Sequence, residues 1–192
     1  MIYNFNEVEA LDRYKLMANT IIPRPIAWIV TEDKVVNVAP FSYFTGLSGN
    51  PATILVSIGH KANGEKKDTL VNILKTKKAT VCIVDDSFYE KLDATKEELP
   101  HDESEADKFN LELIKPFEDY PAMIKGARTA FFCDFFQTVE IGGKTIPTIL
   151  EIKNMYIDDK ILTDKENIRI NFDDALARVG KSYAKIGESL EV

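Results

Sequence analysis

The run KKDT at 66–69 lies directly before a stretch whose apolar residues recur at helical spacing, which predicts a helix over 67–76. A helix N-terminus has unpaired N–H groups and a partial positive charge, and both favour a bound phosphate. Lys67 would add a full charge and Thr69 a hydroxyl donor, whereas the carboxylate of Asp68 would repel a phosphate unless it caps the helix from the side. The competing interpretation is a solvated, lysine-rich loop with an Asx cap.

A second segment of interest is NVAPFSYF at 37–44, where a proline interrupts a strand-like run. Pro40 has no N–H group and fits poorly into a central strand. Such a segment can offer backbone groups, the Ser42 hydroxyl and aromatic surface to the edge of a flat ligand. The turn-rich sequence at 45–51 then predicts a loop. The alternative is a bulged strand and its turn with no ligand, and the two segments together are more specific than either one.

Familiar catalytic signatures are missing from the sequence. No GxGxxG run follows a strand, and neither a P-loop nor a GxSxG motif occurs. The two histidines, His60 and His101, stand far apart in loop-like contexts, which argues against a histidine-ligated metal. Cys82 and Cys133 fall in strand-like apolar runs without CxxC spacing, so they are expected to be inert core residues.

The charge of the chain is unevenly distributed. The 192 residues carry 24 basic and 31 acidic side chains, a formal charge of −7. Residues 85–112 hold eleven acids and three lysines, whereas residues 61–78 hold six lysines and two acids. An acidic total disfavours nucleic acid as a partner, but the basic loop is suited to an anion. No apolar run is long enough for a membrane span and the first residues do not resemble a signal peptide, so we expect a cytoplasmic protein with no membrane partner.

Short strands dominate the predicted elements. We expect a hairpin from 26–31 and 35–38, and a helix over 67–76 with further helical pieces in the acidic stretch. The remaining predictions are strands at 53–59, 79–84, 130–141 and 145–158, with a turn at Gly142-Gly143 joining the last two. Because no regular βαβ alternation occurs, the pattern predicts a mainly β, closed or partly closed antiparallel barrel. We expect a single domain over 1–192 with an acidic helical excursion at about 85–112.

At these residues the sequence resembles the flavin reductase-like, FMN-binding split-barrel family of the flavoredoxin type. The segments that carry the resemblance are PRPIAWIVT at 23–31, NVAPFSYF at 37–44, SGNP at 48–51, ILVSI at 54–58, KDTLVNI at 67–73, and RVG at 178–180 with Tyr183. The resemblance covers about residues 15–185. Pro147 departs from it, since relatives often carry glycine there, and the acidic stretch is matched least.

The resemblance implies a six-stranded, antiparallel Greek-key split β-barrel that forms a homodimer with FMN near the interface. It places the end of the first strand and the segment 37–42 at the isoalloxazine ring or ribityl chain, and the segment 67–69 at the phosphate. The implied cofactor-binding residues are Thr31, Asn37, Ala39, Pro40, Phe41, Ser42, Ser48, Asn50, Ser57, Lys67, Asp68, Thr69, Asn72, Arg178 and Tyr183. No catalytic side chain and no metal ligand is implied, because the flavin carries the redox chemistry.

The function implied first is an oxidoreductase that passes electrons from NAD(P)H through bound FMN to a flavin, a metal complex or a protein. A second possibility is a non-catalytic FMN electron carrier or flavin-storage protein. A third is a protein that binds another phosphorylated cofactor on the same barrel, because Tyr43 and Phe44 can stack on more than one kind of ring. The sequence does not identify the electron acceptor.

Overall fold

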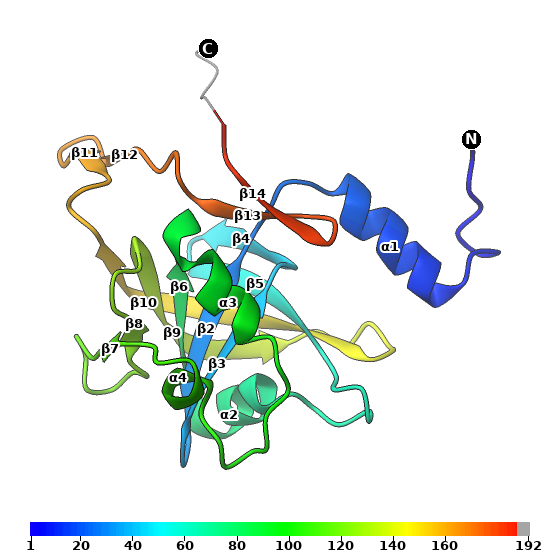
Figure 1. The fold of residues 1–192 in the computed structure, drawn as a ribbon, viewed down its shortest axis with the longest axis horizontal. Coiled ribbons are helices and arrows are strands. Elements are labelled where there is room, and N and C mark those ends of the chain that lie inside the picture. The colour runs from blue at the N-terminus through cyan, green and yellow to red at the C-terminus, as the bar shows by residue number, and fades with distance from the viewer. Residues whose placement is uncertain (188–192) are drawn as a thin grey trace.

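A curled, antiparallel sheet forms the body of the protein in the computed structural model, which describes residues 1–187 (Figure 1). Its seven strands follow the order β3-β2-β6-β9-β10-β5-β4. Their bounds are β2 Ala27–Glu32, β3 Val36–Phe41, β4 Phe44–Gly49, β5 Ala52–Gly59, β6 Lys78–Ile83, β9 Thr129–Thr138 and β10 Thr145–Ile157. The mainly β, antiparallel barrel fold predicted from the sequence is confirmed, and the sheet has seven strands where the resemblance implied six.

Most of the predicted elements lie where the periodicity placed them. The hairpin β2–β3 pairs Thr31 with Asn37, and the helix α2 spans Asp68–Thr76. Strand β9 ends at Thr138, three residues before the predicted end, and the turn that follows places both Gly142 and Gly143 at positive φ. Glycine adopts this backbone conformation at little steric cost, which explains the GG pair at the β9–β10 connection.

The segment 45–51, which the sequence predicts to be a loop, is largely strand. β4 covers Phe44–Gly49 and pairs with β5, with a register shift between Gly46 and Ser48. The prediction failed because β4 is an exposed edge strand, which needs no apolar alternation, and its glycines suit a bulge. Strand β3 is the opposite edge of the same sheet, and this position tolerates Pro40.

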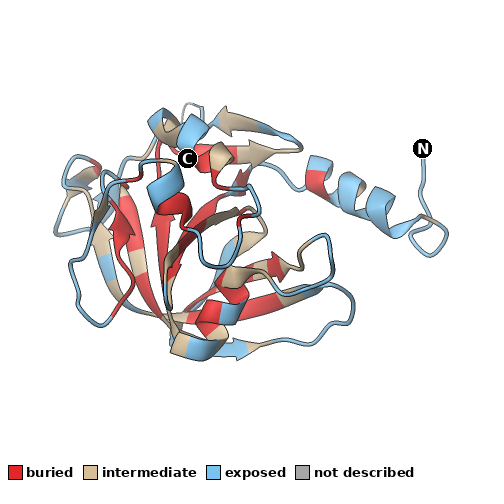
Figure 2. Cartoon of the chain, turned by 60° about the horizontal axis from the view of Figure 1, so that its bottom comes forward, coloured by how far each residue is buried: buried red, intermediate tan, exposed pale blue. Residues whose placement is uncertain are grey.

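The two faces of the sheet bury two apolar clusters, as the alternation along β2 requires. One cluster lies between the sheet and α2 and includes Ile29, Val81 and Ile73. The other lies under the segment 84–127 and includes Trp28, Cys82 and Phe132. Figure 2 shows these buried positions along the strands, with the exposed residues on the surrounding loops. Both clusters support the β2–β3 hairpin, on which many of the predicted site residues lie.

The acidic stretch is helical in places, as predicted. It contains the 3₁₀ helix η1 Asp86–Phe88 and the helices α3 Tyr89–Ala94 and α4 Glu105–Lys108. The Asp85 side chain caps the first turn by accepting a hydrogen bond from the backbone N–H of Ser87. An Asx cap of this kind satisfies a helix-start N–H that has no other partner.

The smaller elements lie outside the seven-stranded sheet. Helix α1 Ala10–Thr20 projects from the body in Figures 1 and 2, and only its Ala18 is buried. A small sheet joins β1 Arg24–Pro25 to the hairpin of β13 Leu176–Val179 and β14 Ser182–Lys185. The remaining pairs are β7 Leu113–Ile114 with β8 Met123–Ile124, and β11 Leu162–Asp164 with β12 Arg169–Ile170. Among residues 1–187 no helix is long and apolar enough to cross a membrane.

Candidate functional site

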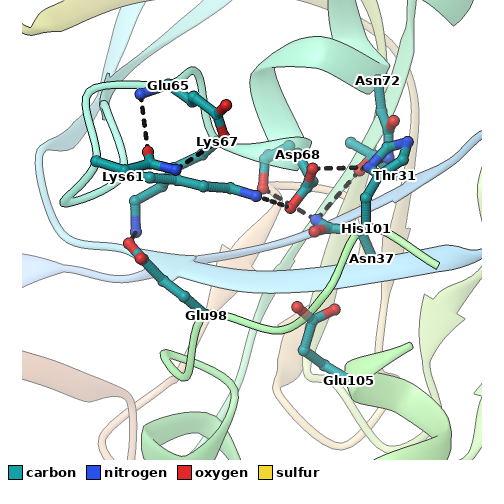
Figure 3. Close-up of polar contacts among 12 residues, drawn as sticks. Thr31, Asn37, Lys61, Glu65, Lys67, Asp68, Asn72, Glu98, His101 and Glu105 are labelled. Atoms are coloured by element: carbon teal, nitrogen blue, oxygen red, sulfur yellow. Dashed lines mark hydrogen bonds and ion pairs between the residues drawn. The ribbon is translucent and has the colours of Figure 1, made fainter. Parts of the chain in front are cut away.

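A buried polar cluster joins the β2–β3 hairpin to the first turns of α2 (Figure 3). The Asn37 amide donates to the Thr69 hydroxyl oxygen at 3.0 Å and to the Thr31 hydroxyl oxygen at 3.3 Å. The Asn72 amide donates to the same Thr31 oxygen at 3.2 Å. The structure therefore brings together four of the predicted site residues, all of them buried.

One acceptor of this cluster has no partner. The Oδ1 atom of Asn72 is buried without a hydrogen bond, on a residue that is only 2% exposed. Leaving a buried acceptor unpaired costs about 1–3 kcal/mol. Asn72 borders a cavity of about 10 Å³ beside His101 and Glu105, which has room for about one water molecule.

Two lysines lie at the start of α2. Lys67 occupies the N-cap position, and Lys61 forms an ion pair with the Asp68 carboxylate at 2.8 Å. Nδ1 of His101 lies 2.7 Å from the other oxygen of the same carboxylate (Figure 3). Burial alone would raise the pKa of Asp68, but the hydrogen bonds from Lys61 and His101 lower it. The negative charge of Asp68 is thus paired with Lys61 and His101. This pairing reduces the repulsion that Asp68 would exert on a phosphate at this helix N-terminus.

The acidic stretch lies across this end of the barrel. Glu98 is 3.8 Å from the Lys67 ammonium, and the Glu105 carboxylate accepts the backbone N–H of Val38 at 2.9 Å. Burial raises the pKa of Glu105, although its hydrogen bond to Val38 opposes the shift. Between this segment, β3 and α2 a cavity of about 60 Å³ remains, lined by Asn37, Ala39 and Lys67 among others. Glu98 and Glu105 therefore line this 60 Å³ cavity together with Lys61 and Lys67.

A larger cavity of about 510 Å³ continues along the other half of β3. Four predicted residues line it: Pro40 and Ser42 from the β3 edge, and Arg178 and Tyr183 from the C-terminal hairpin. Pro40 also lines the smaller cavity, so that one groove follows β3 from Asn37 to Ser42. The Tyr183 hydroxyl donates to Asp93 at 2.9 Å, and burial together with this bond raises the pKa of Tyr183 to about 12.

Six predicted residues do not line this groove: Thr31 and Asn72, which belong to the buried polar cluster, and Phe41, Ser48, Asn50 and Ser57. The Phe41 side chain packs in the core with Ile29 and Val56. Ser48 and Asn50 are exposed at the β4–β5 turn, where the Ser48 hydroxyl oxygen accepts the backbone N–H of Asn50 at 3.2 Å. Ser57 lies on β5, and its N–H donates to the Tyr43 carbonyl oxygen at 2.8 Å.

Several residues of the groove were missed by the sequence interpretation. Lys96, from the acidic stretch, lines both parts of the groove. Arg24 lines the larger part but was noted only as part of a proline-rich run. His101 does not line the groove but contacts Asp68 beside it, and it was set aside as a loop residue. Lys61 was the one missed residue that the sequence could have pointed to, because it belongs to the lysine-rich segment 61–78. The others lie at or beside the groove through contacts between distant parts of the chain.

The fold and this groove together define a split-barrel protein with a cationic cleft along an edge strand. The family model for the flavin reductase like domain matches residues 17–177, and the chain belongs to this family. The family resemblance stated from the sequence is therefore confirmed. Membership makes the chain a flavin-related oxidoreductase whose cofactor is a flavin.

Similar proteins cover the chain over nearly its whole length. An uncharacterized protein of Aquifex aeolicus (strain VF5) is 30% identical over 95% of this chain and 94% of its own length. The structure of nitrilotriacetate monooxygenase component B from Bacillus cereus has a TM-score of 0.91 and 32% identity, covering 100% of this chain and 98% of that one. Flavoredoxin of Desulfovibrio vulgaris (Miyazaki F), with a TM-score of 0.77, 18% identity and coverage of 100% and 97%, shares the fold.

Proposed function

We propose that the protein is an FMN-binding oxidoreductase that passes electrons from NAD(P)H through the flavin to a flavin, metal-complex or protein acceptor. The observation that carries the proposal is the groove along β3. It joins a polar, lysine-bearing helix start to the 39–42 segment at the outer edge of the sheet, and the larger cavity beside that segment leaves room for a second ligand.

The phosphate of FMN is assigned to the start of α2. Lys67 and the Thr69 hydroxyl lie there, beside helix N–H groups that have no partner within the helix. Glu98 argues against this assignment, because its ion pair with Lys67 would have to break when a phosphate binds.

The ring is assigned to the segment from Ala39 to Ser42. Because β3 is an edge strand, the backbone groups on its outer side are not used by the sheet. The hydrogen bond from Val38 to Glu105 shows that such a group on β3 is available to a side chain, and a flavin edge needs the same kind of partner. Donors aimed at the pyrimidine side of the ring stabilise the negative charge that develops on reduction.

A bound flavin would accept a hydride from the nicotinamide and release the electrons to the acceptor, so the protein needs no nucleophile. The two cysteines agree with this assignment. Both are buried, and burial raises the pKa of Cys82 to about 12 and shifts that of Cys133 in the same direction. Thiols in this state are inert, because the thiolate is the reactive form.

We also propose a homodimer with the flavin near the interface. Helix α1 leaves large apolar side chains exposed, including Leu11, Tyr14 and Met17, and Leu47 is exposed on β4. A second copy of the chain would cover this apolar surface. Light scattering coupled to gel filtration tests the proposal, and a monomer at micromolar concentration would contradict it.

The decisive experiment is an anaerobic titration of FMN-loaded protein with NADH and NADPH, followed by absorbance near the flavin maximum. Bleaching by either donor is expected. If the protein binds FMN but neither donor reduces it, an electron-carrier or storage role replaces the reductase. If the protein stays colourless after incubation with FMN and desalting, FMN is not its bound cofactor, and binding of another phosphorylated compound has to be tested.

A further inference from the structure

The 510 Å³ cavity between α1 and the β13–β14 hairpin is lined by cations. Lys15, Arg24, Lys96, Arg178 and Lys181 all border it, and no aspartate or glutamate is among the described residues that do so. The charge of the cavity lining is therefore positive, whereas the net charge of the whole chain is −7. A low-dielectric wall lined by one sign of charge concentrates ligands of the other sign.

Two of these five cations have carboxylate partners outside the cavity. Lys15 pairs with Asp12 and Lys96 with Asp93, each at 2.7 Å. For Arg24, Arg178 and Lys181, no carboxylate lies within ion-pair distance in the part of the chain that the structure describes. Three cations on this wall therefore form no ion pair within residues 1–187.

Arg24 is the most deeply placed of the three. It is only 5% exposed, and its guanidinium donates to the carbonyl oxygens of Ala18 and Ile21 in the α1 segment and of Gly180 in the hairpin turn. Its Nε atom is buried without a partner. A buried charge that has only neutral partners is costly, and an anion in the cavity would offset that cost.

The cavity also presents flat surfaces. The Arg178 guanidinium carbon lies 4.4 Å from the ring centroid of Tyr183, and Tyr14 stacks on Tyr43 with centroids 5.7 Å apart. Planar groups of this kind accept a purine base by stacking. Because Pro40 borders both this cavity and the smaller one, a ligand here lies next to the ring end of the flavin groove.

We propose that this cavity binds the phosphates of the electron donor, and that the cations at its mouth favour NADPH over NADH. The inference rests on the proposed function and assigns the donor a site distinct from the FMN phosphate site at α2. A dinucleotide combines a diphosphate with a base that stacks. The additional 2′-phosphate of NADPH is matched by the exposed Lys15 and Lys181, in the way that basic side chains accept this group in other dinucleotide sites.

Calorimetric titration of the full-length protein with NADP⁺ and with NAD⁺, without added flavin and again with saturating FMN, tests the proposal. We expect NADP⁺ to bind more tightly than NAD⁺, and the double variant K15A/K181A to weaken NADP⁺ about tenfold while affecting NAD⁺ less. Both lysines are exposed, so the variant should fold. Lys185→Ala is the matched control, because Lys185 lies on the same hairpin but pairs with Asp86 and does not line the cavity.

Equal affinity for the two nucleotides in the wild type would overturn the proposal, as would an unchanged NADP⁺ affinity in the double variant. A parallel fall in FMN affinity in that variant would assign the cavity to the flavin phosphate and would also overturn it. Failure of the proposed function has a different signature. In that case FMN does not bind, while the flavin-free NADP⁺ titration still decides whether the cavity selects the 2′-phosphate.

Discussion

Asp68 and His101 lie 33 residues apart in the sequence, yet Oδ1 of Asp68 is 2.7 Å from Nδ1 of His101. Through this contact the acidic stretch is attached to the start of α2. The same carboxylate holds Lys61 on its other oxygen at 2.8 Å. The Asp68 carboxylate thus holds both the basic loop, through Lys61, and the acidic stretch, through His101, at the place where we assign the FMN phosphate.

The Asp68 contacts predict a pH-dependent contribution to stability. Because its partners lower the pKa of Asp68 below the usual 3.8, the ionised form stabilises the folded state above that pH, and the stabilisation is lost as the pH falls through the folded-state value. Asp68→Asn should therefore lower the urea midpoint more at pH 7 than near pH 3. Asp159→Asn, in an exposed pair with Lys165, is the control. An equal loss at both pH values would contradict the prediction.

Lys67→Ala should weaken FMN far more than riboflavin, by about tenfold or more, because the lysine charge acts on the phosphate that riboflavin lacks. Quenching of flavin fluorescence on binding measures both affinities, and the difference should shrink at high salt. Lys66→Ala is a matched control from the neighbouring position, which does not line the groove. Equal losses for the two ligands would place the phosphate elsewhere.

Thr31→Val keeps the shape of a fully buried side chain but removes the oxygen that accepts from Asn37 and Asn72. We expect unfolding free energy to fall by about 1–3 kcal/mol, since buried amide donors lose their partner. Urea unfolding measures the loss. Thr145→Val, at an exposed position of β10, should change stability by much less. A neutral effect of Thr31→Val would mean that water satisfies these amides.

Glu105→Gln should stabilise the protein at pH 7. Burial raises the pKa of Glu105 in the folded state, so ionisation opposes folding once the pH exceeds the unfolded value near 4.5. The penalty is complete above the folded-state pKa and absent well below pH 4.5, whereas glutamine keeps an oxygen for the Val38 N–H. Thermal unfolding at pH 7 and pH 4 checks this, with the exposed Glu103→Gln as control. A lower melting temperature at pH 7 would show that the Glu105 charge is favourable.

The local pattern of apolar and turn-forming residues was sufficient to predict much of the barrel. The unbroken apolar run of Ala27, Trp28 and Ile29 indicates a strand buried on both faces, and the glycine pair at 142–143 marks a tight turn. The prediction of a loop at 45–51 was wrong because β4 is an exposed edge strand, and its sequence therefore has no apolar pattern that would mark it as a strand. Helix α1 was not predicted either, because it buries only Ala18 and its sequence shows little of the apolar pattern of a packed helix.

The residue pattern was enough to predict most strands of the sheet, the helix that carries Asp68 and Thr69, and the family to which the chain belongs. The folded structure was needed to show that Asp68 is paired with Lys61 and His101, that the acidic stretch lies beside Lys67, and that Arg24 lines a cavity with Arg178. Strand and helix formation can be predicted locally because it depends on the spacing of neighbouring residues. Charge pairing between segments depends on how the folded chain brings distant residues together, and no local spacing records it.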